Sequence, residues 1–485
     1  MLTRRAMLMN TAALAATAPR FSHALPLEQN TPTTTLRLQR RVIDVYGRPA
    51  SVYAIRQPND AVGLTTKIGA RFKVRVENEL NEPSILHWHG LTPPWNQDGV
   101  PGVTGPIIPP GLATEYDFAL PLGGTYWMHS HAGFQEQRLM TAPLIVEDPS
   151  FHGDRQQVVV MLSDFSFTPP QEIYQNLTGK KAMEGHSMPA GMEMGHDMTG
   201  HMDMNMEMDM DGKMSMSDLN DVNYDAFLAN DRTLADPQSV AVELGGRVLL
   251  RIINGASMSA FHVDLGEMSG QLVAVDGQAV LPHAGQRFPI ACGQRLDVAV
   301  DLPKERKAFP IFFVLEGERR QTGIVLAPIG AEIKKISEEA SEKSSALDLA
   351  LEGVLRTAAP LAPRKADRVH TLNLTGDMAS YVWSINNIVW QETTQPLELR
   401  AGERVELVLN NHTMMAHPMH LHGHNFQVVE IDGVRFSGAV RDTVFVPPHK
   451  RVVVAFDANN PGHWAFHCHL LYHMHAGMFA TFRYA

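Results

Sequence analysis

Cysteine is nearly absent from this sequence, since its 485 residues include only Cys292 and Cys468. Two cysteines exclude the disulfide-rich class of secreted domains and allow at most one disulfide bond. We predict that they do not pair. Cys468 lies between two histidines in HCH, where a thiolate can serve a metal, and Cys292 lies in a strand-like apolar run that would hold it as a buried, inert thiol.

Positive charge is also scarce, because 41 Lys and Arg stand against 52 Asp and Glu, giving a net charge of -11. An acidic balance argues against nucleic acid or an anionic membrane surface as a partner. No apolar run is long enough to span a bilayer, so we expect no membrane partner. The length allows about three domains of roughly 150 residues each.

The N-terminus has the layout of an export signal. Arg4 and Arg5 form a twin arginine, the short apolar run AMLMNTAALAATA follows, and SHA at 22–24 is a small-x-small cleavage pattern. The alternative is a short amphipathic anchor. We predict a twin-arginine signal peptide over residues 1–24 and a periplasmic protein that folds, and could acquire a cofactor, before export.

Short alternating runs rich in Val, Ile and Phe recur along the chain and are bounded by Gly, Pro, Asn or Asp. This pattern predicts an all-β fold of sandwiches or barrels. Three of the runs resemble one another and begin about one domain length apart: GARFKVRVENEL near 69, GGRVLLRIINGA near 245 and GERVELVLNNHT near 402. The economical interpretation is three related sandwiches, and the alternative is generic strand composition.

Two segments interrupt the β pattern, a methionine-rich one at 183–216 and one near 333–366 that is rich in Glu, Lys, Ser and Ala. The second reads as a linker with some helix. The sequence therefore predicts three domains, at 30–150, at 151–332 with the methionine-rich insert, and at 367–485 after the linker.

Histidine is concentrated in four clusters: HWHG, HSH, HPMHLHGH and HCHLLYHMHAGM. The first two belong to the first predicted sandwich and the last two to the third. On a strand, residues two apart point to the same face. In HCH, His467 and His469 therefore share one face while Cys468 points the opposite way, so that the tripeptide serves two sites.

On the thiolate side, the available ligands are Cys468, His473, Met478 and a histidine from elsewhere, for which His417 is the natural candidate. One Cys, two His and a weak axial Met form the ligand set of a blue-copper electron-transfer site. Structural zinc would favour more thiolates and has no use for a thioether.

Eight histidines remain in i, i+2 pairs, too many for one metal. They suit a cluster of three coppers, two with three ligands and one with two, with open positions for dioxygen. His424 and His475 have no place in this count, and we expect them to support the ligands or lie at the surface. The eight residues are His87, His89, His129, His131, His420, His422, His467 and His469.

These four motifs, in this order, resemble the multicopper oxidases, the family of laccases and bacterial cuprous oxidases. TYWMHSHAGFQEQ, YDAFLANDRT, TMMAHPMHLHG and HCHLLYHM look like its periplasmic copper-resistance branch. The resemblance implies three consecutive cupredoxin-like Greek-key sandwiches. It also implies four coppers (one type 1, one type 2 and two type 3) and an enzyme that oxidises Cu(I), phenols or both and reduces dioxygen to water.

The resemblance also implies a role for each ligand. His417, Cys468, His473 and Met478 would form the mononuclear site, and His87 and His420 would hold the lone copper. His89, His129 and His469 would bind one copper of the coupled pair, and His131, His422 and His467 the other. Electrons would pass from Cys468 through its neighbours His467 and His469.

Two residues bear on proton supply. Asp98 in WNQDGVPG matches the acidic residue that typically lies near the lone copper in this family, where it would deliver protons or orient bound water. The alternative is an ordinary Asp-Gly turn. Many cuprous oxidases carry an acidic residue just before the downstream histidine, but here that position is Tyr472, as in the copper-resistance branch.

The segment 183–216 holds twelve methionines with several Asp and Glu but lacks Val, Ile and aromatics. Thioethers select Cu(I), so our hypothesis is that the segment collects Cu(I) and feeds it to the mononuclear site. A flexible linker is the alternative.

Three other functions fit the composition less well. A copper-sequestering protein with secondary oxidase activity would use the same histidines and methionines. A nitrite-reductase-like enzyme needs no coupled pair, and a simple electron carrier needs no eight further imidazoles. We expect a monomer.

Overall fold

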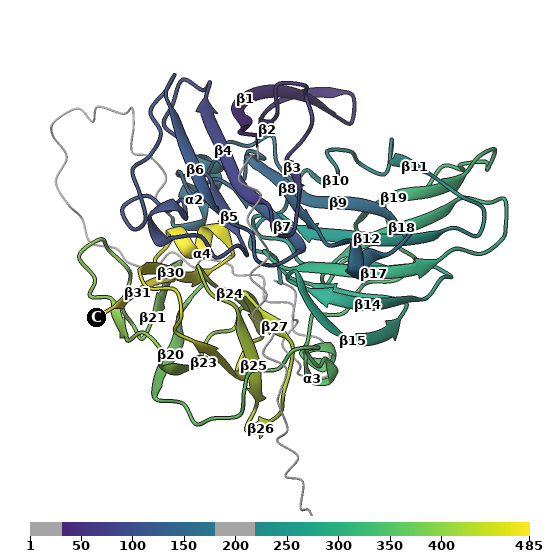
Figure 1. Cartoon of the computed structure of the whole chain (residues 1–485). Helices are drawn as coiled ribbons and strands as arrows, with labels where there is room; N and C mark the ends of the chain where they lie inside the picture. The colour runs from purple at the N-terminus through teal and green to yellow at the C-terminus, as the bar shows by residue number, and fades with distance from the viewer. Residues whose placement is uncertain (1–31, 180–218) are drawn as a thin grey trace, which may run out of the picture.

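The computed structural model describes residues 32–179 and 219–485 (Figure 1). The predicted signal peptide and the methionine-rich segment 183–216 lie outside these residues. The described chain forms six β-sheets, which combine as three pairs along the sequence. In Figure 1 the first pair (purple to blue) lies above the third (green to yellow), and the middle pair (teal) extends to the right.

The first sandwich contains two four-stranded sheets. One has the order β2 (Arg48–Arg56), β1 (Thr34–Val45), β4 (Arg71–Asn78), β6 (Ala113–Ala119). The other has the order β3 (Leu64–Lys67), β8 (Thr141–Glu147), β7 (Gly124–His129), β5 (His87–His89). A 3₁₀ turn, η1 (Trp95–Gln97), follows β5, and a short helix, α1 (Pro149–His152), follows β8.

The middle sandwich pairs a six-stranded sheet with a five-stranded one. The first has the order β10 (Ala226–Ala229), β9 (Gln156–Phe165), β12 (Arg247–Asn254), β17 (Arg295–Asp301), β14 (Gly270–Val275), β15 (Gln278–Gly285). The second has the order β11 (Gln238–Val242), β19 (Gln321–Pro328), β18 (Phe309–Leu315), β13 (Phe261–Asp264), β16 (Arg287–Ile290). Helix α2 (Pro170–Leu177) follows β9.

The third sandwich has seven strands in one sheet and five in the other. The first has the order β21 (Val382–Ile385), β20 (Arg368–Asp377), β23 (Arg404–Asn411), β29 (Arg451–Asp457), β25 (Phe426–Ile431), β26 (Val434–Arg435), with β27 (Val440–Arg441) also paired to β25. The second has the order β22 (Leu397–Leu399), β31 (Phe479–Tyr484), β30 (His463–Cys468), β24 (His417–Leu421), β28 (Thr443–Val446). Helix α4 (Leu471–His475) follows β30.

Alternation of apolar and polar residues explains why the sheets pack face to face. In β4, Phe72, Val74 and Val76 are buried while the residues between them are more exposed. They share one hydrophobic core with Leu144 and Val146 of the opposite sheet. Burying each such side chain contributes about 1.5–3 kcal/mol, so the pattern read as strand in the sequence also fixes which face is inside.

The three repeated strands end in the same hydrogen-bonded corner. Asn78, Asn254 and Asn411 close β4, β12 and β23, and each is buried. In every case the side-chain amide donates to at least two backbone carbonyls, and its oxygen accepts the backbone N–H two residues on. Generic strand composition would not reproduce this arrangement, so the internal repeat is structural.

The next strand of each sandwich crosses a partner at an equivalent position, nine residues after the closing Asn. The cross-strand pairs there are His87↔His129, Val263↔Phe313 and His420↔His467, in chain order. The repeat therefore brings histidines together in the outer two sandwiches and apolar side chains in the middle one.

The structure shows where the predicted linker and the two cysteines lie. The predicted linker 333–366 contains one short helix, α3 (Ala350–Val354). Cys292 lies in the turn between β16 and β17, not in a strand, because Gly293 with φ +82° turns the chain there. Both cysteines are buried and unpaired, which confirms the prediction that they form no disulfide.

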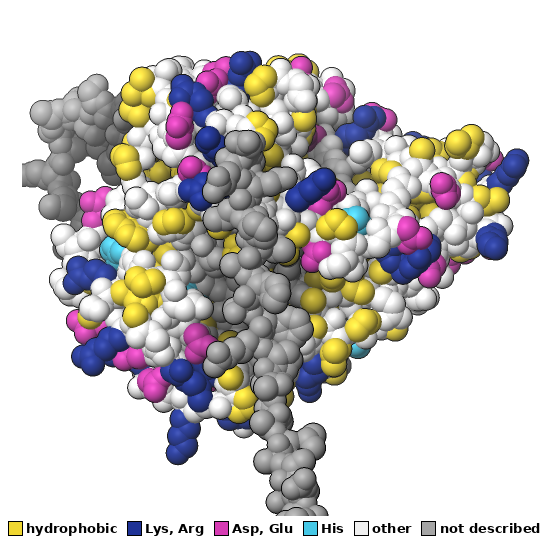
Figure 2. All heavy atoms as spheres, in the orientation of Figure 1, with side chains coloured by type: hydrophobic (Ala, Val, Ile, Leu, Met, Phe, Trp, Pro, Cys, Tyr) yellow, Lys and Arg dark blue, Asp and Glu magenta, His cyan; other side chains and the backbone are white. Residues whose placement is uncertain are grey.

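The surface seen in Figure 2 carries scattered acidic and basic side chains and few histidines. No helix among the described residues is both long and apolar enough to cross a membrane.

Candidate metal centres

The mononuclear site predicted from the sequence is assembled within the third sandwich. The Cys468 Sγ lies 3.6 Å from Nδ1 of His417 and 3.9 Å from Nδ1 of His473, and the two Nδ1 atoms are 3.2 Å apart. All three residues are fully buried. One thiol and two imidazole nitrogens thus converge on a single point.

The other nitrogen of each imidazole is already engaged. His417 Nε2 lies 2.8 Å from Thr413 Oγ1, and His473 Nε2 donates to Asp221 Oδ2 at 2.8 Å. The ring of Trp383 stacks on His473 with centroids 4.1 Å apart. These contacts orient both rings so that Nδ1 faces the thiol, as outer partners of metal-bound histidines do.

The protonation state of His417 suits a metal ligand. Burial, followed by the neighbouring His473, lowers the pKa of His417 well below its usual value, so that the ring is neutral. Burial raises the pKa of the Cys468 thiol, which a bound metal would counter by stabilising the thiolate. Met478 is also buried, and its backbone carbonyl accepts the N–H of Cys468 at 3.1 Å. Axial ligation by its thioether stays a prediction.

On the other face of the HCH tripeptide, two histidines from different sandwiches face each other. The Nε2 atoms of His87 and His420 are 3.4 Å apart. Their Nδ1–H groups donate to the backbone carbonyls of Asp98 and Asp442, each at 2.9 Å. Two lone pairs therefore point at one another, an arrangement that a cation between them would stabilise.

The remaining six histidines gather in two groups of three, with one potential ligand atom from each residue lying within 4.8 Å of the others. The groups are those expected from the sequence: His89, His129 and His469, and His131, His422 and His467. Nε2 of His422 lies 2.9 Å from Nε2 of His467, again with Nδ1 of each ring bonded elsewhere.

Ring nitrogens that lack a hydrogen-bond partner show whether these two groups of histidines fit a metal. Within these two groups, among the described residues, the buried ring nitrogens without a hydrogen-bond partner are His89 Nδ1, His129 Nε2, His131 Nε2, and His469 Nδ1 and Nε2. Burial lowers the pKa of all four rings well below the usual value, so they are neutral. Burying a polar atom without a partner costs free energy of folding, and a set of imidazole ligands suits copper. The two groups of three histidines therefore fit copper.

Asp98 lies inside this cluster. Its side chain is fully buried, with Oδ2 accepting from His422 Nδ1 at 2.8 Å and Oδ1 3.2 Å from His87 Nδ1. The turn interpretation holds as well, since Gly99 has φ +91° and a Cβ there would lie 1.8 Å from the carbonyl oxygen of Leu86. The tight turn is what brings Asp98 to two of the predicted ligand histidines, one from each of two sandwiches.

Two carboxylates beside the cluster were missed in the sequence. Glu136 Oε2 lies 2.8 Å from His129 Nδ1, and its Oε1 lies 4.0 Å from His469 Nδ1. Burial raises the pKa of Glu136 well above its usual value. It occurs in the quoted motif TYWMHSHAGFQEQ, but only the fold shows that the loop after HSH returns to the histidines.

Asp442 is the second missed carboxylate, and it lies 3.1 Å from His89 Nε2 through Oδ1. Although burial alone would raise the pKa of Asp442, the adjacent Arg295 guanidinium holds it below its usual range. Because Asp442 follows His420 by more than twenty residues, no local motif marks it.

The two surplus histidines are not part of any group. His424 is buried, with Nε2 2.7 Å from Tyr484 Oη, and His475 at the surface donates from Nε2 to the Gly133 carbonyl at 2.9 Å. The Tyr472 hydroxyl is buried and has no hydrogen-bond partner in the part of the chain that the structure describes.

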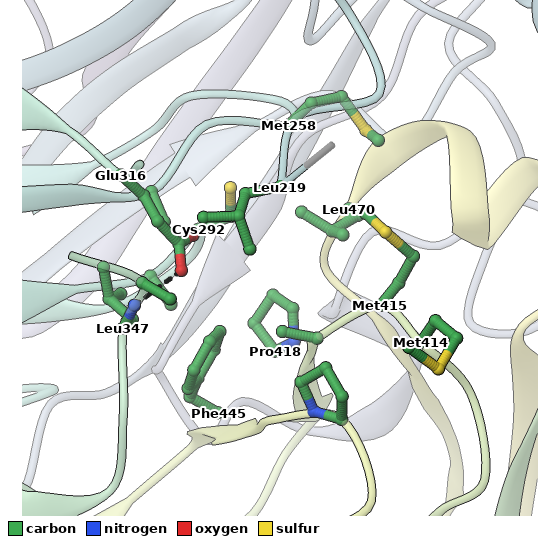
Figure 3. Close-up of a pocket in the computed structure, with 15 residues that line it drawn as sticks. Leu219, Met258, Cys292, Glu316, Leu347, Met414, Met415, Pro418, Phe445 and Leu470 are labelled. Atoms are coloured by element: carbon green, nitrogen blue, oxygen red, sulfur yellow. Dashed lines mark hydrogen bonds between the residues drawn. The ribbon is translucent and has the colours of Figure 1, made fainter. Parts of the chain in front are cut away.

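A cavity of about 70 Å³ lies between the middle and third sandwiches (Figure 3). Its lining includes Met415 and Pro418, which flank His417, and Leu470, two residues after Cys468. Four sulfur-bearing side chains line it: Met258, Cys292, Met414 and Met415.

One carboxyl group, that of Glu316, also lines this cavity. It accepts the backbone N–H of Leu347 at 2.6 Å, and burial raises its pKa to about 7.

Three family models, each described as multicopper oxidase, match residues 48–150, 156–329 and 363–485. The chain belongs to the multicopper oxidase family. It is 31% identical to multicopper oxidase MmcO of Mycobacterium tuberculosis over 462 residues, covering 94% of this chain and 87% of the relative. It is 28% identical to copper resistance protein A of Escherichia coli, covering 87% of each.

Solved structures share the fold. The multicopper oxidase Fet3p superposes with a TM-score of 0.76 at 21% identity, covering 94% of this chain and 90% of that one. The laccase from Botrytis aclada gives 0.74 at 21% identity, covering 93% and 88%. The oxidase therefore consists of cupredoxin-like sandwiches, uses four coppers and couples one-electron oxidation of a reductant to the reduction of dioxygen to water.

Proposed function

We propose that the twelve predicted residues are the copper ligands of a periplasmic oxidase that uses Cu(I) as its reductant and serves copper tolerance. The assignment is the one expected from the sequence: His417, Cys468, His473 and Met478 for type 1, His87 and His420 for type 2, and the two groups of three for the type 3 pair. Asp98 and Cys468 would act directly in catalysis.

The facing nitrogen lone pairs carry this assignment. In the lone-copper pair, and between His422 and His467 of the second group, each Nδ1–H is bonded to an oxygen while the two Nε2 atoms approach each other. Bound copper would supply reversible one-electron chemistry at these points and binding positions for dioxygen. The protein holds these rings oriented before any metal arrives.

The backbone of the HCH tripeptide connects the mononuclear site with the histidine cluster. Cys468 belongs to the mononuclear site, and its covalent neighbours His467 and His469 belong to the histidine cluster, so a through-bond path for electrons exists. A surface hollow reaches His131, the half-buried member of the cluster, and supports access for dioxygen there. Asp98 bonds to His422 and is placed to hold a proton beside the lone-copper position.

The cavity in Figure 3 supports Cu(I) as the reductant. Its thioethers and thiol are soft donors that select Cu(I), and the cavity lies directly against the residues flanking His417. Copper resistance proteins among the relatives point the same way.

Oxygen uptake with Cu(I), measured against uptake with a phenol, tests this choice. Met415→Leu keeps the volume and removes one thioether at the cavity, so we expect turnover on Cu(I) to fall several-fold more than turnover on the phenol. Met268→Leu, a buried methionine of the middle sandwich that does not line the cavity, is the matched control. Equal effects on both reductants would refute the proposal, and copper uptake without sustained oxygen consumption would favour sequestration.

The methionine-rich segment 183–216 extends the same proposal. Its deletion should weaken Cu(I) oxidation more than phenol oxidation. Export by the twin-arginine route predicts that changing Arg4 and Arg5 to Lys keeps the protein in the cytoplasm, as fractionation would show. The domain limits 30–150, 151–332 and 367–485 and a monomeric state are part of the proposal.

A further inference from the structure

The middle sandwich supplies none of the twelve proposed ligands, yet its loop between β16 and β17 lies against the histidine cluster. A Cβ on Gly293 would lie 2.8 Å from Cδ2 of His469 and 3.2 Å from Cε1 of His89. The backbone of this loop therefore contacts two cluster rings, one from each outer sandwich.

Arg295, two residues further on, reaches into the third sandwich. Its guanidinium is fully buried and binds Asp442 in a bidentate pair, Nη1 to Oδ1 at 2.7 Å and Nη2 to Oδ2 at 2.5 Å. Its Nε donates to the backbone carbonyl of Thr125 in the first sandwich at 3.1 Å. One side chain thus joins all three sandwiches.

Asp442, which binds Arg295, also contacts two proposed ligands. Its Oδ1 lies 3.1 Å from His89 Nε2, and its backbone carbonyl accepts from His420 Nδ1 at 2.9 Å. His89 comes from the first sandwich and His420 from the third. The Thr443 hydroxyl lies 3.1 Å from the same two nitrogens. Together with it, Asp442 favours a proton on Nε2 of His89 and on Nδ1 of His420, which leaves the other nitrogen of each ring free to bind a metal.

We propose that Arg295 and Asp442 are positioning residues of the histidine cluster, through which the middle sandwich sets the donor atoms of His89 and His420. The inference rests on the proposed copper assignment. Asp442 has its orientation fixed by both guanidinium nitrogens, so the middle sandwich must dock before the cluster is complete. Copper capture by the cluster then depends on a domain that contributes no ligand.

Removing the guanidinium leaves a buried carboxylate without its cation, free to turn away from His89. Loss of such an outer partner typically weakens metal affinity by about 10–100-fold. In Arg295→Met we expect the affinity of the cluster for copper, measured by competition with a chelator, to be about 10–100-fold lower than in the wild type. The mononuclear site, which has no contact with this pair among the described residues, should keep its copper.

Arg251→Met is the matched control. Arg251 is equally buried in the middle sandwich, pairs with Asp297 at 3.1 Å and donates to Thr125 Oγ1 at 2.8 Å. Among the described residues it contacts no cluster histidine, so its loss removes a buried ion pair at the same interface without touching a proposed ligand.

The experiment dialyses copper-loaded full-length protein against a chelator. Total copper, the electron paramagnetic resonance signal of the lone copper and the thiolate-to-copper absorption band are then followed. Loss of the lone-copper signal in Arg295→Met, with the thiolate band retained and Arg251→Met unchanged, supports the proposal. Equal losses in both variants, or retention in both, overturns it.

Asp442→Asn keeps the size of the side chain and decides the matter if Arg295→Met does not fold. A lone-copper signal altered in shape, with the thiolate band intact, supports the proposal, and an unaltered signal overturns it. Failure of the proposed function is distinguishable, because the wild type would then lack the copper signals or consume no oxygen with Cu(I) before any variant is compared.

Discussion

The mononuclear site and the histidine cluster share one tripeptide but are built in different ways. All four proposed ligands of the mononuclear site lie between 417 and 478, within a single sandwich. The cluster takes four histidines from the first sandwich and four from the third, and its outer partners come from all three. The first site takes all its proposed ligands from one sandwich and one outer partner, Asp221, from the middle sandwich, whereas the second takes its proposed ligands from two sandwiches and exists only when these have docked.

This difference predicts unequal responses to mutation. Changes at the proposed ligands and outer partners of the mononuclear site should affect that site while leaving the cluster loaded, and changes at the contacts of the cluster histidines should do the reverse.

Cys468→Ser should abolish oxygen uptake, because it removes the thiolate that the mononuclear copper needs and interrupts the supply of electrons to the histidine cluster. The thiolate-to-copper band should vanish while three coppers per chain remain, as metal analysis would show. Loss of all four coppers would mean that the two sites do not assemble independently.

Asp98→Asn should lower turnover by about 10–100-fold, because the hydrogen bond from His422 Nδ1 at 2.8 Å loses its charged acceptor. The thiolate band should be unchanged. The measurement is the rate of reoxidation by dioxygen of the fully reduced protein. A normal reoxidation rate would leave Asp98 with only its role in the turn.

Asp221→Asn is the counterpart on the mononuclear side, where His473 Nε2 donates to Asp221 at 2.8 Å. Reduction of the mononuclear copper under nitrogen should slow by about 10-fold, with reoxidation unaffected. Slowing of reoxidation instead would contradict the separation of the two sites.

Glu316 gives the smallest effect, and it concerns stability. Its pKa is raised by burial from 4.5 to about 7, so the folded protein holds a proton that the unfolded chain releases. The resulting stabilisation is complete below about pH 4.5 and is lost as the pH rises through about 7. Relative to Glu316→Gln, the free energy of unfolding should fall by about 3 kcal/mol over this range, as denaturant titrations would measure. A constant difference would exclude the raised pKa.

Sequence patterns predicted much of the fold and the grouping of the histidines. Strand alternation placed Cys468 opposite His467 and His469, because the period of two survives in any sheet. Outer partners such as Arg295, Asp442 and Glu136 could not be predicted, since their roles arise from domain docking and from a returning loop. Cys292 was misplaced because an apolar run does not reveal the turn inside it.

The three closing asparagines mark equivalent positions in sandwiches that do different work. Nine residues on from each lie His87, Val263 and His420, and their cross-strand partners are His129, Phe313 and His467. The middle sandwich therefore has an apolar pair where the outer two have proposed copper ligands. It contributes no proposed ligand of its own, and through Arg295 it joins the two sandwiches that do.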